Sequence, residues 1–250
     1  MNLILLTSVD STNNYLQELS EKGLAEEGTI VLSLEQSKGK GQRGSDWESK
    51  PGFGLYVSIL LKPKNWTVEK QYILNKAVAV GVAWYIDSKT DKDVRIKWPN
   101  DILIAEKKVA GILIENVIRG EIVSSVIAGI GINLNQNDFT REFETPATSL
   151  KIVTGKNFDP ETEAVELFRE VWKAYNQIIA GESETMEEHY SHYLFKRGER
   201  ALFIKGEGLF YGVLKSVDSS GAALIEENGR TIRATHPGTR FYLRDKRFRN

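Results

Sequence analysis

The 250-residue sequence contains no cysteine and only three histidines, His189, His192 and His236. The absence of cysteine excludes disulfides, thiolate metal sites, redox motifs and cysteine nucleophiles, and three histidines leave little for a histidine metal site. Any catalysis must therefore use Lys, Arg, Asp, Glu, Ser or Thr side chains.

An excess of one charge and long hydrophobic runs are also missing. The 33 Lys and Arg residues face 34 Asp and Glu residues, a net charge of −1, so no overall field attracts nucleic acid or an anionic membrane. The amino terminus lacks the basic and apolar regions of a signal peptide. The longest apolar run, residues 77–86, is about half of what a membrane-spanning helix needs. We expect a cytoplasmic protein that binds neither nucleic acid nor membranes.

Apolar periodicity divides the chain into two parts that meet near residue 197. The first part predicts strands at 3–6, 29–34 and 55–61, and helices that begin near residues 12, 67, 159 and 184. We expect side chains among residues 10–12, and Thr67, to cap the first two helices. Four further strands, at 94–98, 102–105, 109–118 and 121–134, predict an antiparallel meander. Short β segments separated by glycines predict a small β-barrel over 198–250.

Residues 35–54 form a glycine-rich loop whose positions 39–44 match the dinucleotide pattern G-x-G-x-x-G. That pattern requires a helix to begin at the turn, but a proline and two glycines at 51–54 lead into a strand instead, so NAD binding is not predicted. The loop's backbone N–H groups could still surround an anionic ligand, together with its cations Lys38, Lys40 and Arg43. A solvated hairpin loop with ordinary surface cations is the alternative.

Polar residues also gather at the end of the predicted strand 94–98. The strand period places Lys97 beside a turn made of Pro99, Asn100 and Asp101, where a cation, an amide and a carboxylate could converge. A hairpin corner with turn-favouring residues explains the same pattern. Lys108 begins the next strand but one, and a lysine at a hairpin turn is usually only solvated.

Three glycines, Gly111, Gly129 and Gly131, interrupt the predicted meander. Glycine weakens strand interiors and often marks the close approach of a ligand or another backbone. Gly129 and Gly131 lie two residues apart and therefore on one face of the sheet, which favours a groove there. Close packing of a helix would explain the pair equally well.

Five segments, in this order, resemble those of biotin protein ligases, which attach biotin to a lysine of biotin-dependent carboxylases. They are STNN at 11–14, EQ at 35–36 with the glycine-rich loop and Trp47, KWPND at 97–101, KVAGILIE at 108–115 and GIGIN at 129–133. The resemblance implies an α+β fold: a central mixed or antiparallel sheet flanked by helices over residues 1–197, as in the biotin/lipoate ligase catalytic domain. A small C-terminal SH3-like β-barrel over 198–250 would follow it.

The resemblance also implies a two-step reaction. Biotin is first activated by ATP to biotinyl-5′-AMP and is then transferred to a lysine of a biotin carboxyl carrier domain of an acyl-CoA carboxylase. ATP, biotin and Mg²⁺ are the implied ligands, with Mg²⁺ bridged through the ATP phosphates and no separate metal site in the protein.

The matching positions imply roles for individual residues. Lys108 would bridge the biotin carbonyl and the α-phosphate, Lys97 would complement it, and Asp101 would accept the proton of the carrier lysine. Biotin would contact Ser11, Thr12, Asn13, Gln36, Gly39, Lys40, Gly41, Gln42, Lys108, Gly111 and Gly129. ATP or the adenylate would contact Lys40, Arg43, Trp47, Lys97, Asn100 and Asn133, with Trp47 closing over the intermediate and Asn133 at the adenine.

The sequence departs from the family pattern in its loop and at its start. Gln42 and Ser45 stand where many members carry arginines, and Arg43 could compensate for them. The chain begins directly at the catalytic domain, without a helix-turn-helix segment, so we expect no operator binding. The exposed edge of the meander could pair two chains in a homodimer.

Two other functions compete with biotin ligation. A lipoate or octanoate ligase or transferase shares the fold, but would need an unbranched apolar channel and little of the polarity that Ser11, Thr12 and Gln36 offer to a ureido ring. A non-catalytic biotin or nucleotide sensor is the third interpretation. The presence of Lys97, Asp101 and Lys108 together argues against it.

Overall fold

A seven-stranded mixed sheet forms the larger part of the computed structural model, which describes residues 1–42, 47, 49–139 and 145–243. Its strand order is β1-β2-β3-β7-β6-β5-β4. Strands β1 and β2 are parallel, and every other neighbouring pair is antiparallel. The strands are β1 Asn2–Leu6, β2 Thr29–Ser33, β3 Gly54–Leu61, β4 Val94–Lys97, β5 Asp101–Ile104, β6 Lys107–Arg119 and β7 Ile122–Asn133. The predicted meander is therefore confirmed.

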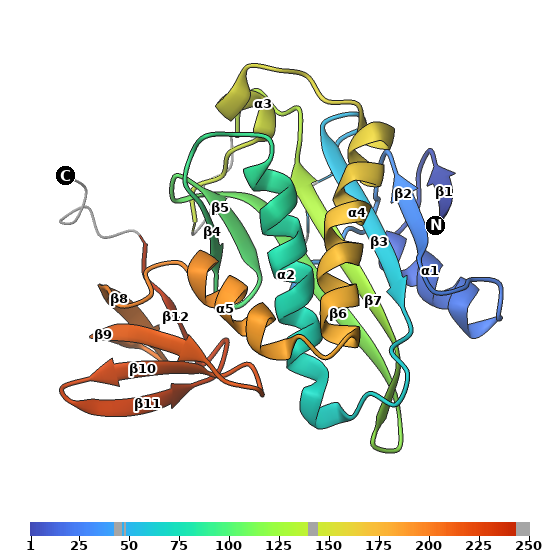
Figure 1. Cartoon of the computed structure of the whole chain (residues 1–250). Coiled ribbons are helices and arrows are strands. Elements are labelled where there is room, and N and C mark those ends of the chain that lie inside the picture. The colour runs from blue at the N-terminus through green and yellow to red at the C-terminus, as the bar shows by residue number, and fades with distance from the viewer. Residues whose placement is uncertain (43–46, 48, 140–144, 244–250) are drawn as a thin grey trace.

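Helices α2 and α4 lie side by side over one face of this sheet (Figure 1). Helix α2 is buried around most of its circumference because it packs against the sheet, α4 and α5. The two helices approach closely at Gly81, where a Cβ atom would lie 2.5 Å from the Cα of Val171. The helices are α1 Thr12–Glu21, the 3₁₀ turn η2 Val68–Lys70, α2 Gln71–Asp87, α3 Leu150–Thr154, α4 Pro160–Ile179 and α5 Ser183–Tyr193.

Helix α1 covers only part of the opposite face. Its Leu16 packs against Val31, Leu60 and Ile127 in a small second core, while the neighbouring positions Ile30 and Leu32 point into the large core under α2 and α4. The rest of this face, over β6 and β7, is left for the cavity described below.

The helix caps differ from those predicted. Ser11 and Thr67 occupy N-cap positions, but neither side chain accepts a capping hydrogen bond. Gln36 does so for α1 in their place, because its Oε1 accepts from the backbone N of Thr12 at 2.8 Å. Ser149 caps α3, a helix of five residues that is too short for its periodicity to be recognised in the sequence.

A second, antiparallel sheet follows α5, in the order β11-β10-β9-β8-β12. The small C-terminal β unit expected from the sequence is therefore present, and because no ladder joins β11 to β12 among the described residues, its sheet is open rather than a closed barrel. Strand β12 is only three residues long and pairs with β8 alone, and β11 buries only its last residue, Ala234, which leaves little surface for closure. The strands are β8 Arg200–Lys205, β9 Gly208–Val217, β10 Ala223–Glu227, β11 Arg230–Ala234 and β12 Thr239–Phe241.

The two sheets share one apolar core. Phe203, Leu214, Ile225 and Phe241 of the C-terminal strands belong to the same buried cluster as α2 and the large sheet. The division into domains at residue 197 stays a prediction. None of the helices in the described part of the chain is long and apolar enough to cross a membrane.

The outer edge of the meander is β4, the edge expected to support a homodimer. Leu194 forms a parallel bridge with Ile96, and the N–H of Phe195 donates to the carbonyl of Ile96 at 2.9 Å. The chain after α5 thus covers part of this edge, and the homodimer stays a prediction.

Candidate active site

A cavity of about 630 Å³ opens on the α1 side of the sheet, over the glycines of β6 and β7. This volume lies within the range of roughly 300–1,000 Å³ that is typical of small-molecule sites. Of the residues expected from the sequence, it is lined by Ser11, Thr12, Asn13, Gln36, Lys40, Gly41, Gln42, Trp47, Lys97, Asn100, Asp101, Lys108, Gly111, Gly129 and Asn133. Gly39 is buried beside the cavity against Trp47, and Arg43 lies outside the described residues.

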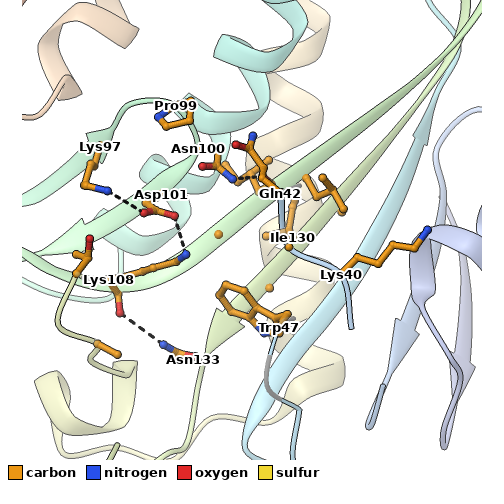
Figure 2. Close-up of a pocket in the computed structure, with 18 of the residues that line it drawn as sticks. Lys40, Gln42, Trp47, Lys97, Pro99, Asn100, Asp101, Lys108, Ile130 and Asn133 are labelled. Carbon is orange, nitrogen blue, oxygen red and sulfur yellow. Dashed lines mark hydrogen bonds and ion pairs between the residues drawn. The ribbon is translucent and has the colours of Figure 1, made fainter. Parts of the chain in front are cut away.

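One end of the cavity holds two lysines and a carboxylate. The Nζ of Lys108 lies 2.7 Å from Oδ1 of Asp101, and the Nζ of Lys97 lies 3.2 Å from Oδ2. Figure 2 shows the two ammonium groups directed at Asp101 from two sides. The pairing of β4 with β5 sets Lys97 opposite Asp101. A register shift between Ile102 and Leu103 pairs Lys108 of β6 with Leu103, which lies on the same face of β5 as Asp101.

The charges of this cluster are unequal. Burial by itself would raise the pKa of Asp101, but the ammonium groups of Lys108 and Lys97 outweigh it and hold the pKa below its usual range. Asp101 is therefore an anion at neutral pH and a weak proton acceptor. Two cations and one anion leave this end of the cavity with a positive charge, which suits an anionic ligand.

Trp47 lies on the glycines of the sheet. A Cβ atom at Gly111 would come within 2.6 Å of its indole, and one at Gly131 within 2.5 Å. The Nζ of Lys108 lies 5.2 Å from the ring centroid, a cation–π distance. Gly111 and Gly131 thus leave space for the side chain of Trp47. From the sequence, the expected neighbour was a ligand in a groove or a closely packed helix.

A polar network without net charge occupies the other end of the cavity, where the carboxylate of Glu115 lies 3.9 Å from the ammonium group of Lys40. Oε1 of Gln36 accepts from the backbone N of Thr12 and lies 3.1 Å from the Thr12 hydroxyl. The Ser58 hydroxyl lies 2.8 Å from Thr12 Oγ1 and 2.6 Å from Asn13 Oδ1, and the Asn13 amide donates to Glu115 at 2.6 Å. A Cβ atom at Gly129 would overlap the Asn13 amide, so this glycine makes room for the network.

Three residues that were expected to contact a ligand also form hydrogen bonds within the protein. Lys40 donates to Asn14 Oδ1 at 2.5 Å and points away from the two lysines at the charged end (Figure 2). The amide of Asn100 donates to the Ile112 carbonyl at 2.7 Å, and that of Asn133 to the Thr148 carbonyl at 3.0 Å. Lys40 therefore stands nearer the neutral end of the cavity than the charged end.

Several other residues line the cavity, and the sequence assigned no ligand contact to them. Gln136 lies three residues after Asn133 in the chain. Its buried Oε1 has no hydrogen-bond partner in the described part of the chain. His236 and Arg240 come from the C-terminal sheet. No local pattern marks these two, because only the packing of the second sheet brings them to the cavity. The others are Lys50, Trp98, Pro99, Ile112, Leu113, Ile130, Gly131, Asp138, Phe139, Thr145 and Ala147.

Comparison with known proteins assigns the chain to a family. The sequence model described as the Biotin/lipoate A/B protein ligase family matches residues 5–133, just over half of the chain. The chain belongs to this family. The match ends at Asn133. It includes the residues that form the charged end and the neutral end of the cavity.

Relatives in this family match most of the chain. The bifunctional ligase/repressor BirA of Bacillus subtilis is 33% identical over 229 residues, which are 91% of this chain and 70% of the relative. The biotin--[acetyl-CoA-carboxylase] ligase of Paracoccus denitrificans is 30% identical and covers 88% of this chain and 92% of its own. The biotin protein ligase of Aquifex aeolicus, solved in complex with biotin and ATP, has a TM-score of 0.80 at 30% identity, with 96% and 98% of the two chains covered. The family's fold thus extends through the C-terminal sheet.

Proposed function

We propose that this chain is a biotin protein ligase, which forms biotinyl-5′-AMP from biotin and ATP and then transfers biotin to a lysine of a carrier protein. The observation that carries this proposal is the cavity itself. It joins a neutral polar end to a positively charged end in a family whose named relatives are biotin ligases. Biotin supplies a neutral ureido ring and a carboxylate, and ATP supplies the phosphates.

The first step needs positive charge at the α-phosphate. A carboxylate oxygen of biotin attacks this phosphorus, the bond to the β-phosphate oxygen breaks, and pyrophosphate leaves with its electron pair. Negative charge accumulates on the phosphoryl oxygens, where fixed cations lower the barrier because they need no reorganisation. Lys108 and Lys97 supply these cations, and Asp101 holds both in place.

The neutral end of the cavity is suited to the ureido ring. This ring has two N–H donors and one carbonyl acceptor, so it needs partners of both kinds. Gln36, Thr12 and Ser11 lie at this end and can supply them. The apolar body of biotin would then extend along the sheet toward Lys108.

Mg²⁺ would be carried by the nucleotide. The described residues contain no group of three or more His, Asp or Glu that could hold a metal ion. Mg²⁺ commonly takes phosphate oxygens, water and at most one or two carboxylates, and the donors available here fit that pattern. When bound, it would neutralise charge on the phosphates and on the departing pyrophosphate.

In the second step the carrier lysine attacks the activated carbonyl and AMP leaves. The attacking amine must be neutral, although its unperturbed pKa is about 10.4. Asp101 was expected to accept this proton, but its lowered pKa gives only a small driving force for the transfer. We therefore assign Asp101 first to positioning the two lysines. The proposed acceptor is a biotin carboxyl carrier domain of an acyl-CoA carboxylase.

A parallel assay of two acids tests this function. Purified protein is mixed with Mg²⁺-ATP, a carrier domain, and either biotin or lipoate, and the products are analysed by mass spectrometry. We expect biotinyl-AMP and a carrier increased by the mass of biotin. Transfer of lipoate in preference would make the chain a lipoate ligase, and tight binding of biotin without either product would make it a sensor.

The glycines beneath Trp47 provide a test of how the adenylate is retained. Replacing Gly131 by alanine should push the indole away from the sheet, because a Cβ atom there would lie 2.5 Å from it. A displaced indole should let water in and let the adenylate out, so the fraction of biotinyl-AMP released into solution should rise by about tenfold. Filtration followed by mass spectrometry measures that fraction.

The matched control for this substitution is Gly208→Ala. A Cβ atom at Gly208 would make only an ordinary contact, at 3.5 Å. The control should retain the adenylate as the unaltered protein does. Equal release from the two variants would show that Trp47 does not close the site.

A further inference from the structure

A buried lysine, Lys76, lies where α2, α5 and the C-terminal sheet meet. Its side chain is 1% exposed, and its ammonium group is fully hydrogen-bonded. It donates to both carboxylate oxygens of Glu187 on α5, at 2.6 and 2.7 Å, and to the carbonyl of Val217 at the end of β9, at 2.7 Å. The rings of Tyr72 and Tyr190 enclose it, with centroids 5.7 and 5.3 Å from Nζ.

Burying the ammonium group of Lys76 removes it from water, which is unfavourable for folding. The residue therefore needs a reason other than stability. The side chain of Glu187 is 44% exposed, and an ion pair of a buried lysine with such a partner contributes little net stability compared with apolar residues of similar size. What Lys76 does provide is a directed hydrogen bond between α2, which packs on the large sheet, and Val217 of the C-terminal sheet. In Figure 1 the C-terminal sheet stands beside α5 and β4, next to this junction.

The segment that Lys76 holds continues directly to the cavity. Four residues after Val217, Gly221 packs against Tyr72, where a Cβ atom would overlap the ring. The carbonyl of Gly221 accepts a hydrogen bond from Nε1 of Trp98 at 2.9 Å. Trp98 follows Lys97 in the chain, and its ring meets that of His236 edge to face at 5.7 Å.

We propose that Lys76 is a positioning residue for adenylate formation. It docks the C-terminal sheet so that Trp98 is fixed beside Lys97, and so that His236 and Arg240 reach the lining of the cavity. The inference rests on the proposed function, and it adds a residue that touches neither substrate. Lys76 acts through the carbonyl of Val217 and the turn that leads to Gly221.

The test replaces Lys76 by methionine, with Lys89→Met as the matched control. Lys89 also lies between two carboxylates, Glu163 and Glu166, but it ties the segment just after α2 to α4, and none of its ion pairs among the described residues involves the C-terminal sheet. Both variants should lose stability. Only Lys76→Met should raise the KM for ATP, by on the order of tenfold, and leave the dissociation constant of biotin within about twofold.

A double variant separates positioning from stability. Lys76→Met combined with Glu187→Leu replaces the ion pair by apolar side chains, which commonly restores stability. Val217 still has no ammonium group to bind, so we expect the melting temperature to recover and the KM for ATP to stay raised. A KM that recovers together with the melting temperature would overturn the proposal.

The indole N–H resonance of Trp98 gives a measurement that does not depend on activity. It should shift in Lys76→Met and in the double variant, and stay in place in Lys89→Met. An unmoved resonance in all three variants would overturn the proposed link. Absence of biotinyl-AMP from the unaltered protein would instead contradict the proposed function, while the resonance would still test the link.

Discussion

Replacing Lys108 by methionine is expected to lower the rate of biotinyl-AMP formation by about 10²–10³-fold, the usual effect of removing one fixed group that stabilises transition-state charge. The ammonium group of Lys108 is held 2.7 Å from Asp101 and faces Trp47, so it is positioned before the substrates arrive. Methionine keeps much of the side chain's length and removes its charge. The rate is measured in a single turnover with biotin and Mg²⁺-ATP in the absence of a carrier.

The adjacent lysine provides the control for this substitution. Lys107 is exposed at the first position of β6 and does not line the cavity, so Lys107→Met should adenylate biotin at the normal rate. We expect the dissociation constant of biotin to rise much less than the rate falls in Lys108→Met, because the ureido ring binds at the other end, and to stay unchanged in Lys107→Met. An undiminished rate in Lys108→Met would remove this residue from the mechanism.

Replacing Asp101 by asparagine should affect both the reaction and the fold. The variant keeps the shape of the side chain but leaves the ammonium groups of Lys97 and Lys108 without their shared anion. We expect adenylate formation to slow by about 10²-fold as the lysines separate. The free energy of unfolding should fall by about 1.5–3 kcal/mol at pH 7, as for other hydrogen bonds to charged groups.

The pH dependence of this loss distinguishes Asp101 from a neutral buried side chain. Lys108 and Lys97 hold its folded-state pKa below the ordinary value of about 3.9. The carboxylate therefore stabilises the fold fully above that value, and the contribution disappears as the pH falls through the folded-state pKa. Urea unfolding should show a constant difference between the two proteins from about pH 5 to 7 and a shrinking one below about pH 4. A difference that is independent of pH would contradict the assigned pairing.

The large sheet could be predicted because its strands are consecutive. Alternating apolar residues and short turns from residue 94 to residue 134 give a meander in which each strand pairs with the next. The place of Lys97 beside Asp101 follows from the same alternation. The sequence predicted the small C-terminal β unit but not that its sheet stays open, because closure depends on contacts between strands far apart in the chain, which a strand of three residues such as β12 does not signal.

The site was less predictable where its geometry depends on long-range packing. Gln36 was expected to bind a ligand, but its role as the cap of α1 requires the loop and the helix to be adjacent, which no local pattern reveals. Gly111 and Gly131 marked a close approach, yet the sequence did not identify Trp47 as the group that approaches. His236 and Arg240 reach the cavity only through the docking of the second sheet.

Order of addition tests the central claim most directly, namely that one cavity carries out both half-reactions. The protein is incubated with biotin and Mg²⁺-ATP, freed of unbound substrates by rapid filtration, and then mixed with a carrier domain alone. We expect biotinyl-AMP to remain bound after filtration, and its disappearance to match the appearance of biotinylated carrier and of AMP. A bound adenylate that never reaches the carrier, or a carrier modified without prior formation of the adenylate, would contradict the account.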